Sequence, residues 1–150
     1  MEIKELSDIH ETFEAYEVYK HCMYMPTFEK YNQQIASYLQ DESIKIFACC
    51  DNDIIKGIIV ILFFEYNQAE ILGIAVDTSE RGRGIGSYMI NTLKDTYALK
   101  VINAETDDDA VGFYKKYGFE TTRIVKEYDG QKYIRYKCKL EKGSFTSNLS

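Results

Sequence analysis

A glycine-rich turn between a strand and a helix restricts the folding of this chain more than any other feature. Its residues, RGRGIG at 81–86, follow the apolar run ILGIAV and precede a segment with apolar residues at helical spacing. Glycine adopts backbone angles that side chains forbid and lets another molecule approach the main chain closely. The turn therefore predicts a strand–helix connection at which free helical amides and two arginines favour the binding of a phosphate.

The rest of the chain divides into short apolar segments separated by polar turns. We expect strands at 1–6, 44–50, 54–66, 69–76 and 100–105 and two more after residue 118, with helices at 8–22, at 27–39, from 85 onward and at 108–117. This order, βααβββαβαββ, predicts an α/β domain with one strand–helix–strand unit near its middle. The domain is expected to span residues 1–141, and residues 142–150 are expected to form a flexible tail.

The spacing of apolar residues also predicts which faces are buried. The residues expected on these faces are Ile9, Phe13, Tyr16 and Tyr19 of the first helix, Phe28, Tyr31, Ile35 and Leu39 of the second, Tyr88, Met89, Thr92 and Leu93 of the third, and Ile134, Tyr136, Cys138 and Leu140 of the last strand.

Composition restricts the partners of this domain. The chain has 150 residues and a formal net charge of -6, which disfavours a nucleic-acid backbone as the main partner because phosphate binding requires clustered cations. No apolar stretch reaches the ~18 residues of a membrane span, and the polar amino terminus is unlike a secretion signal. We therefore expect a cytoplasmic protein that binds neither nucleic acid nor membrane; a homodimer is compatible with the sequence.

The four cysteines lack the spacing of a metal site or a redox motif. Cys49 and Cys50 are adjacent, which makes a poor zinc clamp, and Cys22 and Cys138 are distant from them along the chain. The two histidines fall on one predicted helix. We expect reduced thiols in the core and no metal.

Two common nucleotide-binding motifs do not fit the turn. A P-loop needs a lysine directly after its last glycine, but Ser87 follows Gly86 here. A dinucleotide fingerprint has the spacing G-x-G-x-x-G near the first strand–helix turn of its domain. This turn has the spacing G-x-G-x-G and comes after several strands. The phosphate ligand is therefore of another kind.

The turn resembles the acetyl-CoA motif of the GNAT superfamily of N-acetyltransferases, Q/R-x-x-G-x-G/A, through Arg81, Gly84 and Gly86. A second segment, DDDAVGFYKKYGFE, resembles the family's later helix motif, N-x-x-A-x-x-x-Y-x-K-x-G-F. The matching residues are Ala110, Tyr114, Lys116, Gly118 and Phe119, with Asp107 in the position of the usual asparagine. The resemblance covers residues 1–141. It implies a mixed, mostly antiparallel twisted sheet with splayed central strands flanked by helices, and acetyl-CoA as cosubstrate.

The resemblance also implies which residues bind the coenzyme. Main-chain groups of Ile74 and Val76 would pair with the pantetheine arm, and an amide near Val76 would polarise the thioester carbonyl. Amides of the turn would hold the pyrophosphate. The expected coenzyme-binding residues are Ile74, Val76, Arg81, Gly82, Arg83, Gly84, Ile85, Gly86, Ser87, Asp107 and Tyr114. The acidic run at 107–109 is also typical of a helix cap, because carboxylates accept from the first amides of a helix.

Acetyl transfer to an amine needs a group that accepts the amine proton and a group that protonates the leaving thiolate. Glu70 is the first candidate for the base and Glu65 the second; either is also typical of a solvated charge at a strand end. By resemblance Tyr114 is the general acid, and the alternative is packing on a helix face. Tyr117 is the second candidate acid, with a core position favoured for it.

The acceptor is expected to be a primary amine of a small molecule or peptide. The residues expected to line its site are Tyr24, Met25, Phe28, Tyr31 and Tyr128. A polyamine, an amino acid, an aminoglycoside-like compound and a protein amino terminus all stay open. Because neither motif contains a cysteine, direct transfer is favoured over an acyl-enzyme. The rival hypothesis is a non-catalytic module that senses acyl-CoA; acetylation of aminoacyl-tRNA is disfavoured by the acidic charge.

Overall fold

The computed structural model of the protein describes residues 1–141, apart from the side chains of residues 9–11. Its elements are β1 (Glu2–Leu6), α1 (Ile9–Tyr19), the 3-10 turn η1 (Lys20–Cys22), α2 (Phe28–Leu39), β2 (Ile44–Asp51), β3 (Ile54–Phe64), β4 (Gln68–Val76), the 3-10 turn η2 (Thr78–Glu80), α3 (Ile85–Thr96), β5 (Val101–Thr106), α4 (Val111–Tyr117), β6 (Glu120–Tyr128) and β7 (Gln131–Glu141). The predicted order of strands and helices is confirmed. The predicted tail at 142–150 lies outside the described residues.

One seven-stranded sheet organises the molecule, in the order β1-β2-β3-β4-β5-β7-β6. Every neighbouring pair is antiparallel except β4 and β5, which are parallel. These two strands pair only over 68–71 and 101–104. Beyond that point β4 continues alone on this side through residues 72–76, while 105–106 of β5 pair with β7. The predicted splay of the central strands is therefore confirmed, and we call the separation between 72–76 and 105–106 the strand opening.

A β-bulge in β4 lies where the opening begins. Val60 of β3 pairs with Gly73 and Ile61 pairs with Ile71, so Leu72 is the extra residue. A bulge shifts the alternation of side chains and increases the local twist of a strand. Consistent with this shift, Ile71 and Ile74 pack on the same side of the sheet although they are three positions apart, an odd spacing that would place them on opposite sides of a regular strand. The bulge thus helps to turn β4 away from β5.

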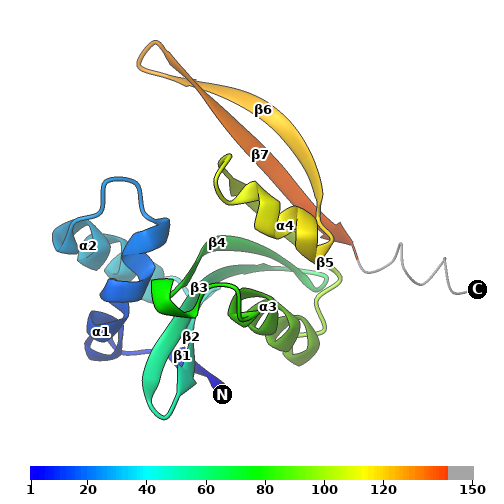
Figure 1. The fold of residues 1–150 in the computed structure, drawn as a ribbon. Helices are drawn as coiled ribbons and strands as arrows, with labels where there is room; N and C mark the ends of the chain where they lie inside the picture. Colours follow the sequence, from blue (N-terminus) through cyan, green and yellow to red (C-terminus); the bar gives the residue numbers. More distant parts are fainter. Residues whose placement is uncertain (142–150) are drawn as a thin grey trace, which may run out of the picture.

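Helices cover both faces of the sheet (Figure 1). α1 and α2 enclose one cluster of buried side chains, which includes Leu6, Tyr31 and Ile58. α3 and α4 enclose the other, which includes Met89 and Tyr114. Because strand side chains alternate between the two faces, β2, β3 and β4 each contribute to both clusters, and this part of the sheet is packed on both sides.

Three predicted helix faces are partly wrong. On α2, Phe28 is 37% exposed. On α1, Phe13 is 61% exposed, whereas Thr12, Ala15 and Val18 are buried. On α3, Tyr88 is 37% exposed and its hydroxyl donates to the Met1 carbonyl at 3.2 Å. Periodicity fixes the spacing of a helix face, but its rotation follows from packing against the sheet, where small residues such as Ala15 permit close approach.

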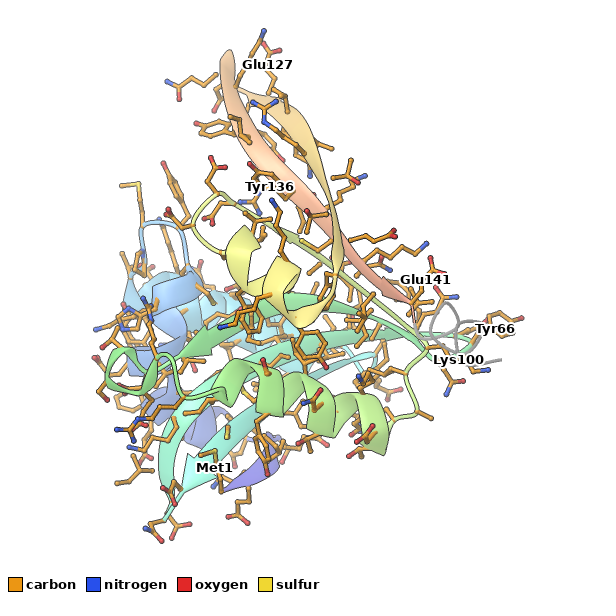
Figure 2. The ribbon with its side chains drawn as sticks, turned by 45° about the vertical axis from the view of Figure 1, so that its right-hand side comes forward. Met1, Tyr66, Lys100, Glu127, Tyr136 and Glu141 are labelled. Atoms are coloured by element: carbon orange, nitrogen blue, oxygen red, sulfur yellow. The ribbon has the colours of Figure 1, made fainter. Side chains whose placement is uncertain are left out.

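The β6–β7 hairpin extends beyond the helices, with Glu127 at its outer end (Figures 1 and 2). Ile134, predicted to be buried, is 38% exposed because no helix covers the outer half of the hairpin. An ion-pair cluster fastens the hairpin to β5: Glu105 accepts from Lys126 at 2.7 Å and from Arg135 at 3.2 Å. Desolvation acts to raise the pKa of Glu105, but these two hydrogen bonds outweigh it and hold that pKa below its usual value.

The helices of residues 1–141 do not meet the requirements of a membrane crossing: none of them is both long enough and apolar enough.

Candidate active site

The glycine-rich turn presents unoccupied main-chain donors. Gly82 and Gly84 have φ angles of 82° and 77°, in the left-handed region that disfavours side chains, and the space beside each Cα is open. The first helical bond of α3 runs from the Tyr88 amide to the Gly84 carbonyl at 2.9 Å. Among the described residues, no side chain caps this helix and no backbone acceptor binds the amides of residues 84–87. These amides and the positive end of the helix form an anion site.

Gly86 has a different role from the two glycines before it. A Cβ at this position would lie 2.8 Å from the Phe113 ring, so the close contact between α3 and α4 requires glycine. From the sequence, all three glycines of the turn are expected to adopt backbone angles that other residues disfavour. The structure corrects that interpretation for Gly86, which has a helical backbone and allows close packing between helices.

Ion pairs and a small cap hold the turn from the β3 side. The Asp77 carboxylate accepts from the Ser79 amide at 3.0 Å and hydroxyl at 2.7 Å. Glu80 pairs with Lys56 at 3.0 Å and with Arg83 at 3.4 Å. Arg81 is exposed and forms no ion pair within the described part of the chain. One guanidinium therefore stays available for an anion beside the free amides.

The free edge of β4 faces the strand opening. The Asp77 amide donates to the Lys56 carbonyl of β3 at 2.8 Å. Because main-chain groups alternate in direction along a strand, the amides of Val76 and Ile74 point away from β3 and toward the opening. An extended ligand could pair with them as an added strand.

Tyr114 is almost fully buried. Its ring packs edge-on against Phe113 and Phe119 at centroid distances of 5.2 and 5.1 Å, and the residue is 3% exposed. Within residues 1–141 its hydroxyl forms no hydrogen bond, and since no fully buried side-chain oxygen there lacks a partner, only the edge of this oxygen is exposed. Burial, aided by the nearby Cys138 and Cys22 thiols, raises the pKa of Tyr114.

Cys22 joins this group, which sequence reasoning missed. It is exposed and ends the η1 turn after α1, and its thiol donates to the Tyr19 carbonyl at 3.2 Å. The sulfur also interacts with the Tyr19 hydroxyl and the Ile74 amide, and desolvation raises its pKa to about 11. The prediction of a core position is therefore wrong for Cys22, although Cys49, Cys50 and Cys138 are buried and all four thiols are free.

Tyr19 lies directly over the bulged part of β4. A Cβ on Gly73 would overlap the Tyr19 hydroxyl and lie 2.9 Å from the ring carbon that carries it, so this position requires glycine. The Tyr19 hydroxyl also interacts with Cys22 and Tyr38, and desolvation raises its pKa. Tyr38 in turn interacts with Gln34 of α2. A continuous set of polar groups thus connects α2 with the free edge of β4.

A pocket of about 520 Å³ lies between these groups and α2. Its lining residues are Tyr19, Cys22, Met23, Tyr24, Lys30, Gln33, Gln34 and Leu72. We call it the α2 pocket. Of the residues expected to line the acceptor site, it contains Tyr24, which is 82% exposed at its rim. Most of its lining comes from the loop after α1 and from one face of α2, segments that carry no recognisable motif.

The other expected acceptor residues lie elsewhere. Tyr31 is 1% exposed and its hydroxyl donates to the Thr12 carbonyl, so it packs between α1 and α2. Phe28 contacts the rings of Phe13 and Tyr16 at 5.0 and 5.3 Å in the same aromatic cluster. Aromatic rings bury a large apolar area, which favours the packing of Tyr31 and Phe28 between α1 and α2 over a place in the lining of the α2 pocket.

Met25 and Tyr128 are both solvent-exposed, at 65% and 58%. Met25 lies in the loop before α2 but outside the α2 pocket. Tyr128 ends β6 at the outer turn of the hairpin, with its ring 6.0 Å from that of Tyr133. Tyr128 is not among the residues that line the α2 pocket.

The two candidate bases differ in position. Glu70 pairs in register with Asn103 of β5, one pair before the strand opening begins. Alternation places its side chain opposite Ala69 and Ile71, on the α1–α2 side. Glu65 is exposed in the β3–β4 turn, at the end of β4 that lies away from the opening. Glu70 is therefore nearer to the Leu72 bulge, about 7 Å along the strand at ~3.3 Å per residue.

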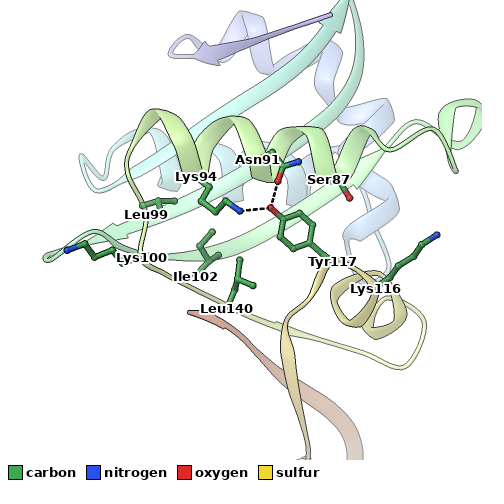
Figure 3. Close-up of a pocket in the computed structure, with 9 residues that line it drawn as sticks. All are labelled: Ser87, Asn91, Lys94, Leu99, Lys100, Ile102, Lys116, Tyr117 and Leu140. Carbon is green, nitrogen blue, oxygen red and sulfur yellow. Dashed lines mark hydrogen bonds between the residues drawn. The ribbon is translucent and has the colours of Figure 1, made fainter. Parts of the chain in front are cut away.

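Asp107 and Tyr117 have structural partners. The Asp107 carboxylate accepts from the Ala110 amide at 3.0 Å, which closes the turn before α4; α4 itself begins at Val111 without a side-chain cap from the described residues. The place of Asp107 among the coenzyme-binding residues stays a prediction. The Tyr117 hydroxyl donates to Asn91 and accepts from Lys94 at 3.4 Å, so it faces α3 (Figure 3).

A second pocket, of about 390 Å³, lies between α3, α4 and the adjoining strands (Figure 3). It begins beside the glycine-rich turn at Ser87 and contains Lys94, Lys100 and Lys116. Three ammonium groups in an acidic protein make this an electropositive recess. Lys116 belongs to the second family motif, but the recess as a whole was not predicted.

The described residues contain no cluster of metal ligands: within 1–141, no three His, Cys, Asp or Glu side chains are grouped so that they could hold a metal ion.

Comparison with known proteins identifies the family. The profile described as "Acetyltransferase (GNAT) domain" matches residues 10–140. The chain is 34% identical over 90 residues to the histone acetyltransferase GCN5 of Debaryomyces hansenii, a match that covers 51% of this chain and 20% of that protein. The chain thus spans about a fifth of the length of this relative.

Two solved structures share the fold. A spermidine N-acetyltransferase SpeG chimera from Vibrio cholerae and hSSAT has a TM-score of 0.75 at 16% identity and covers 97% of both chains. A GNAT family acetyltransferase from Elizabethkingia anophelis, with acetyl-CoA bound, has a TM-score of 0.66 at 20% identity and covers 93% of this chain and 97% of its own. With the profile match over most of its length, this chain belongs to the GNAT acetyltransferase family.

Proposed function

We propose that this protein transfers the acetyl group of acetyl-CoA directly to the primary amine of a small molecule or peptide. One observation carries the proposal: Cys22 of the α2 pocket interacts both with Tyr114 and with the Ile74 amide at the free edge of β4, so the three parts of the site adjoin. A donor held along β4 and an acceptor in the pocket would meet there. Such positioning supplies much of the rate acceleration of a two-substrate reaction.

The coenzyme would be held mainly by main-chain groups. Amides of residues 84–87 would bind the pyrophosphate, with Arg81 adding charge. Amides of Ile74 and Val76 would pair with the pantetheine arm. The lysines beside Ser87 would favour the phosphate on the nucleotide end of the coenzyme. In this arrangement the thioester lies beyond Ile74, nearer Leu72 than Val76, because the polar groups of the site gather there.

The acceptor amine must lose a proton before it attacks. An alkylamine with a pKa of ~10.4 needs about 4.6 kcal/mol to be neutral at pH 7, at ~1.36 kcal/mol for each pH unit. Glu70 is our candidate for the group that accepts this proton, directly or through water, because it lies on the pocket side of β4 next to the bulge. Glu65 would be too far along the strand.

Tyr114 would protonate the leaving thiolate. Its raised pKa keeps the phenol protonated at neutral pH but makes it a weaker acid. The Cys22 thiol, which lies beside Ile74 of β4, shows the effect of this environment on a sulfur group: desolvation raises its pKa to about 11. The thiolate of the coenzyme would become more basic for the same reason, which restores the match between acid and leaving group.

Because Cys22 lies beside β4, an acyl-enzyme mechanism in which its thiol accepts the acetyl group is the alternative to direct transfer. A thiol attacks as its thiolate, and a pKa of about 11 leaves little thiolate at neutral pH. Direct transfer therefore stays the favoured mechanism. The rival hypothesis of an acyl-CoA sensor predicts coenzyme binding without turnover.

The experiment that tests the proposal follows free thiol during incubation of the protein with acetyl-CoA and a panel of amines, with calorimetry on acetyl-CoA alone in parallel. Thiol release that depends on an amine is the expected result. Coenzyme binding without release with any amine would favour the sensor. Absence of both would refute the proposed site at residues 84–87.

A further inference from the structure

The charges around the α2 pocket indicate the class of acceptor, an inference that rests on the proposed transferase function. The pocket contains one charged side chain, Lys30, together with the carboxamides of Gln33 and Gln34 and the hydroxyls of Tyr19 and Tyr24. No carboxylate belongs to its lining. The formal charge of this lining is therefore positive, although the whole chain carries a net charge of -6.

Lys30 has donors to spare. Its ammonium donates to the Met25 carbonyl at 3.1 Å, which uses one of three N–H groups. Within residues 1–141 Lys30 takes part in no ion pair, whereas Lys20, Lys45 and Lys56 each pair with a glutamate. Lys30 is exposed, so its remaining N–H groups are open to a ligand in the pocket.

The polar side chains of α2 face the same way. Residues 30, 33 and 34 are three and four positions apart, so they share one face of the helix. The two carboxamides offer both donors and acceptors next to the ammonium. Together they match a carboxylate or peptide group, whereas a second ammonium on the ligand would meet Lys30 without any anion in the lining.

We propose that the acceptor is an amine that carries its own carboxylate, as an amino acid or short peptide does, and not a polyamine. The carboxylate binds Lys30 and the carboxamides on the α2 side, and the amine points toward Glu70 and the strand opening. The pocket volume of about 520 Å³ suits a ligand of this size. The polyamine named in the SpeG chimera would find no carboxylate in this lining.

Matched acceptors test the inference. Lysine and tyrosine are compared with their decarboxylated counterparts, cadaverine and tyramine, by thiol release at saturating acetyl-CoA. We expect kcat/KM to be at least about tenfold higher for the amino acids, the scale of one hydrogen bond to a charged group. Tyrosine amide lacks the negative charge but keeps an α-amine of low pKa, so it separates recognition of the carboxylate from basicity of the amine.

Charge reversal in the pocket gives the second arm. Lys30→Glu should lower the ratio of amino-acid to amine turnover by about tenfold or more, while Lys132→Glu, the same change on the exposed hairpin strand β7, should leave the ratio unchanged. Acetyl-CoA affinity of both variants, measured by calorimetry, reports folding of the donor site. Preference of the wild type for cadaverine and tyramine, or an unchanged ratio in Lys30→Glu, overturns the inference and leaves the transferase function intact. Absence of turnover with every amine overturns both.

Discussion

The glycine-rich turn and the α2 pocket adjoin the same strand, β4, but they are built from different parts of the chain. The turn offers main-chain amides whose positions follow from two glycines in the left-handed region, Gly82 and Gly84, and the start of a helix. The pocket offers side chains from α1, η1, α2 and the β4 bulge. A site made of backbone keeps its chemistry when its side chains change, whereas a site made of side chains changes with each substitution. The fold can therefore keep its donor while its acceptor varies.

Substitution of Tyr114, the proposed general acid between the donor and acceptor regions, should have the largest effect. Tyr114→Phe keeps the ring packing against Phe113 and Phe119 but removes the proton donor. We expect kcat to fall by ~10²–10⁴, with little change in acetyl-CoA affinity by calorimetry. An unchanged kcat would exclude Tyr114 as the general acid.

The pH profile of the wild-type protein also tests whether Tyr114 is the general acid. Because the pKa of Tyr114 is raised, the phenol stays protonated to higher pH than a free tyrosine. Activity should therefore rise as the acceptor loses its proton and should show no alkaline loss from Tyr114 below about pH 10. A decline beginning near neutral pH would point to another acid.

Substitutions in the turn test whether the donor site is made of backbone. Gly84→Val places a β-branched residue at φ 77°, so the turn must strain or rearrange at a cost of ~1–3 kcal/mol. We expect acetyl-CoA affinity to fall by roughly tenfold to a hundredfold. Arg83→Ala is the matched control: its side chain is 72% exposed and already paired with Glu80, so affinity should change by less than about fivefold. The reverse order of effects would break the comparison.

Gly73 tests the acceptor side, where we expect the smallest effect. In Gly73→Ala the new methyl group displaces the Tyr19 hydroxyl from its place over the bulge. Overpacking of this kind costs ~1–3 kcal/mol of unfolding free energy, measurable by urea denaturation. The KM for the acceptor should rise several-fold while acetyl-CoA affinity stays nearly constant. Tyr19→Phe in the same chain should restore part of the stability, and failure to do so would place the strain elsewhere.

The order of the elements was predictable because each segment carries its own periodicity. The predicted end of the fourth helix at residue 117 is confirmed, and Gly118 follows it with a φ of 122°. The register of the helices was less predictable. Thr12 and Ala15 replace Phe13 on the buried face of α1 because the sheet, and not the helix, decides which side packs.

The candidate site divides in the same way. Amino-acid sequence by itself determined the turn at 81–87, since free amides and left-handed glycines depend on neighbouring residues alone. Only the tertiary structure brought Cys22, Tyr19 and Lys30 to β4, about fifty residues away along the chain. Contacts between distant segments depend on how helices and sheet pack together, and no local pattern records that packing. The donor could thus be inferred from spacing, and the acceptor only from the fold.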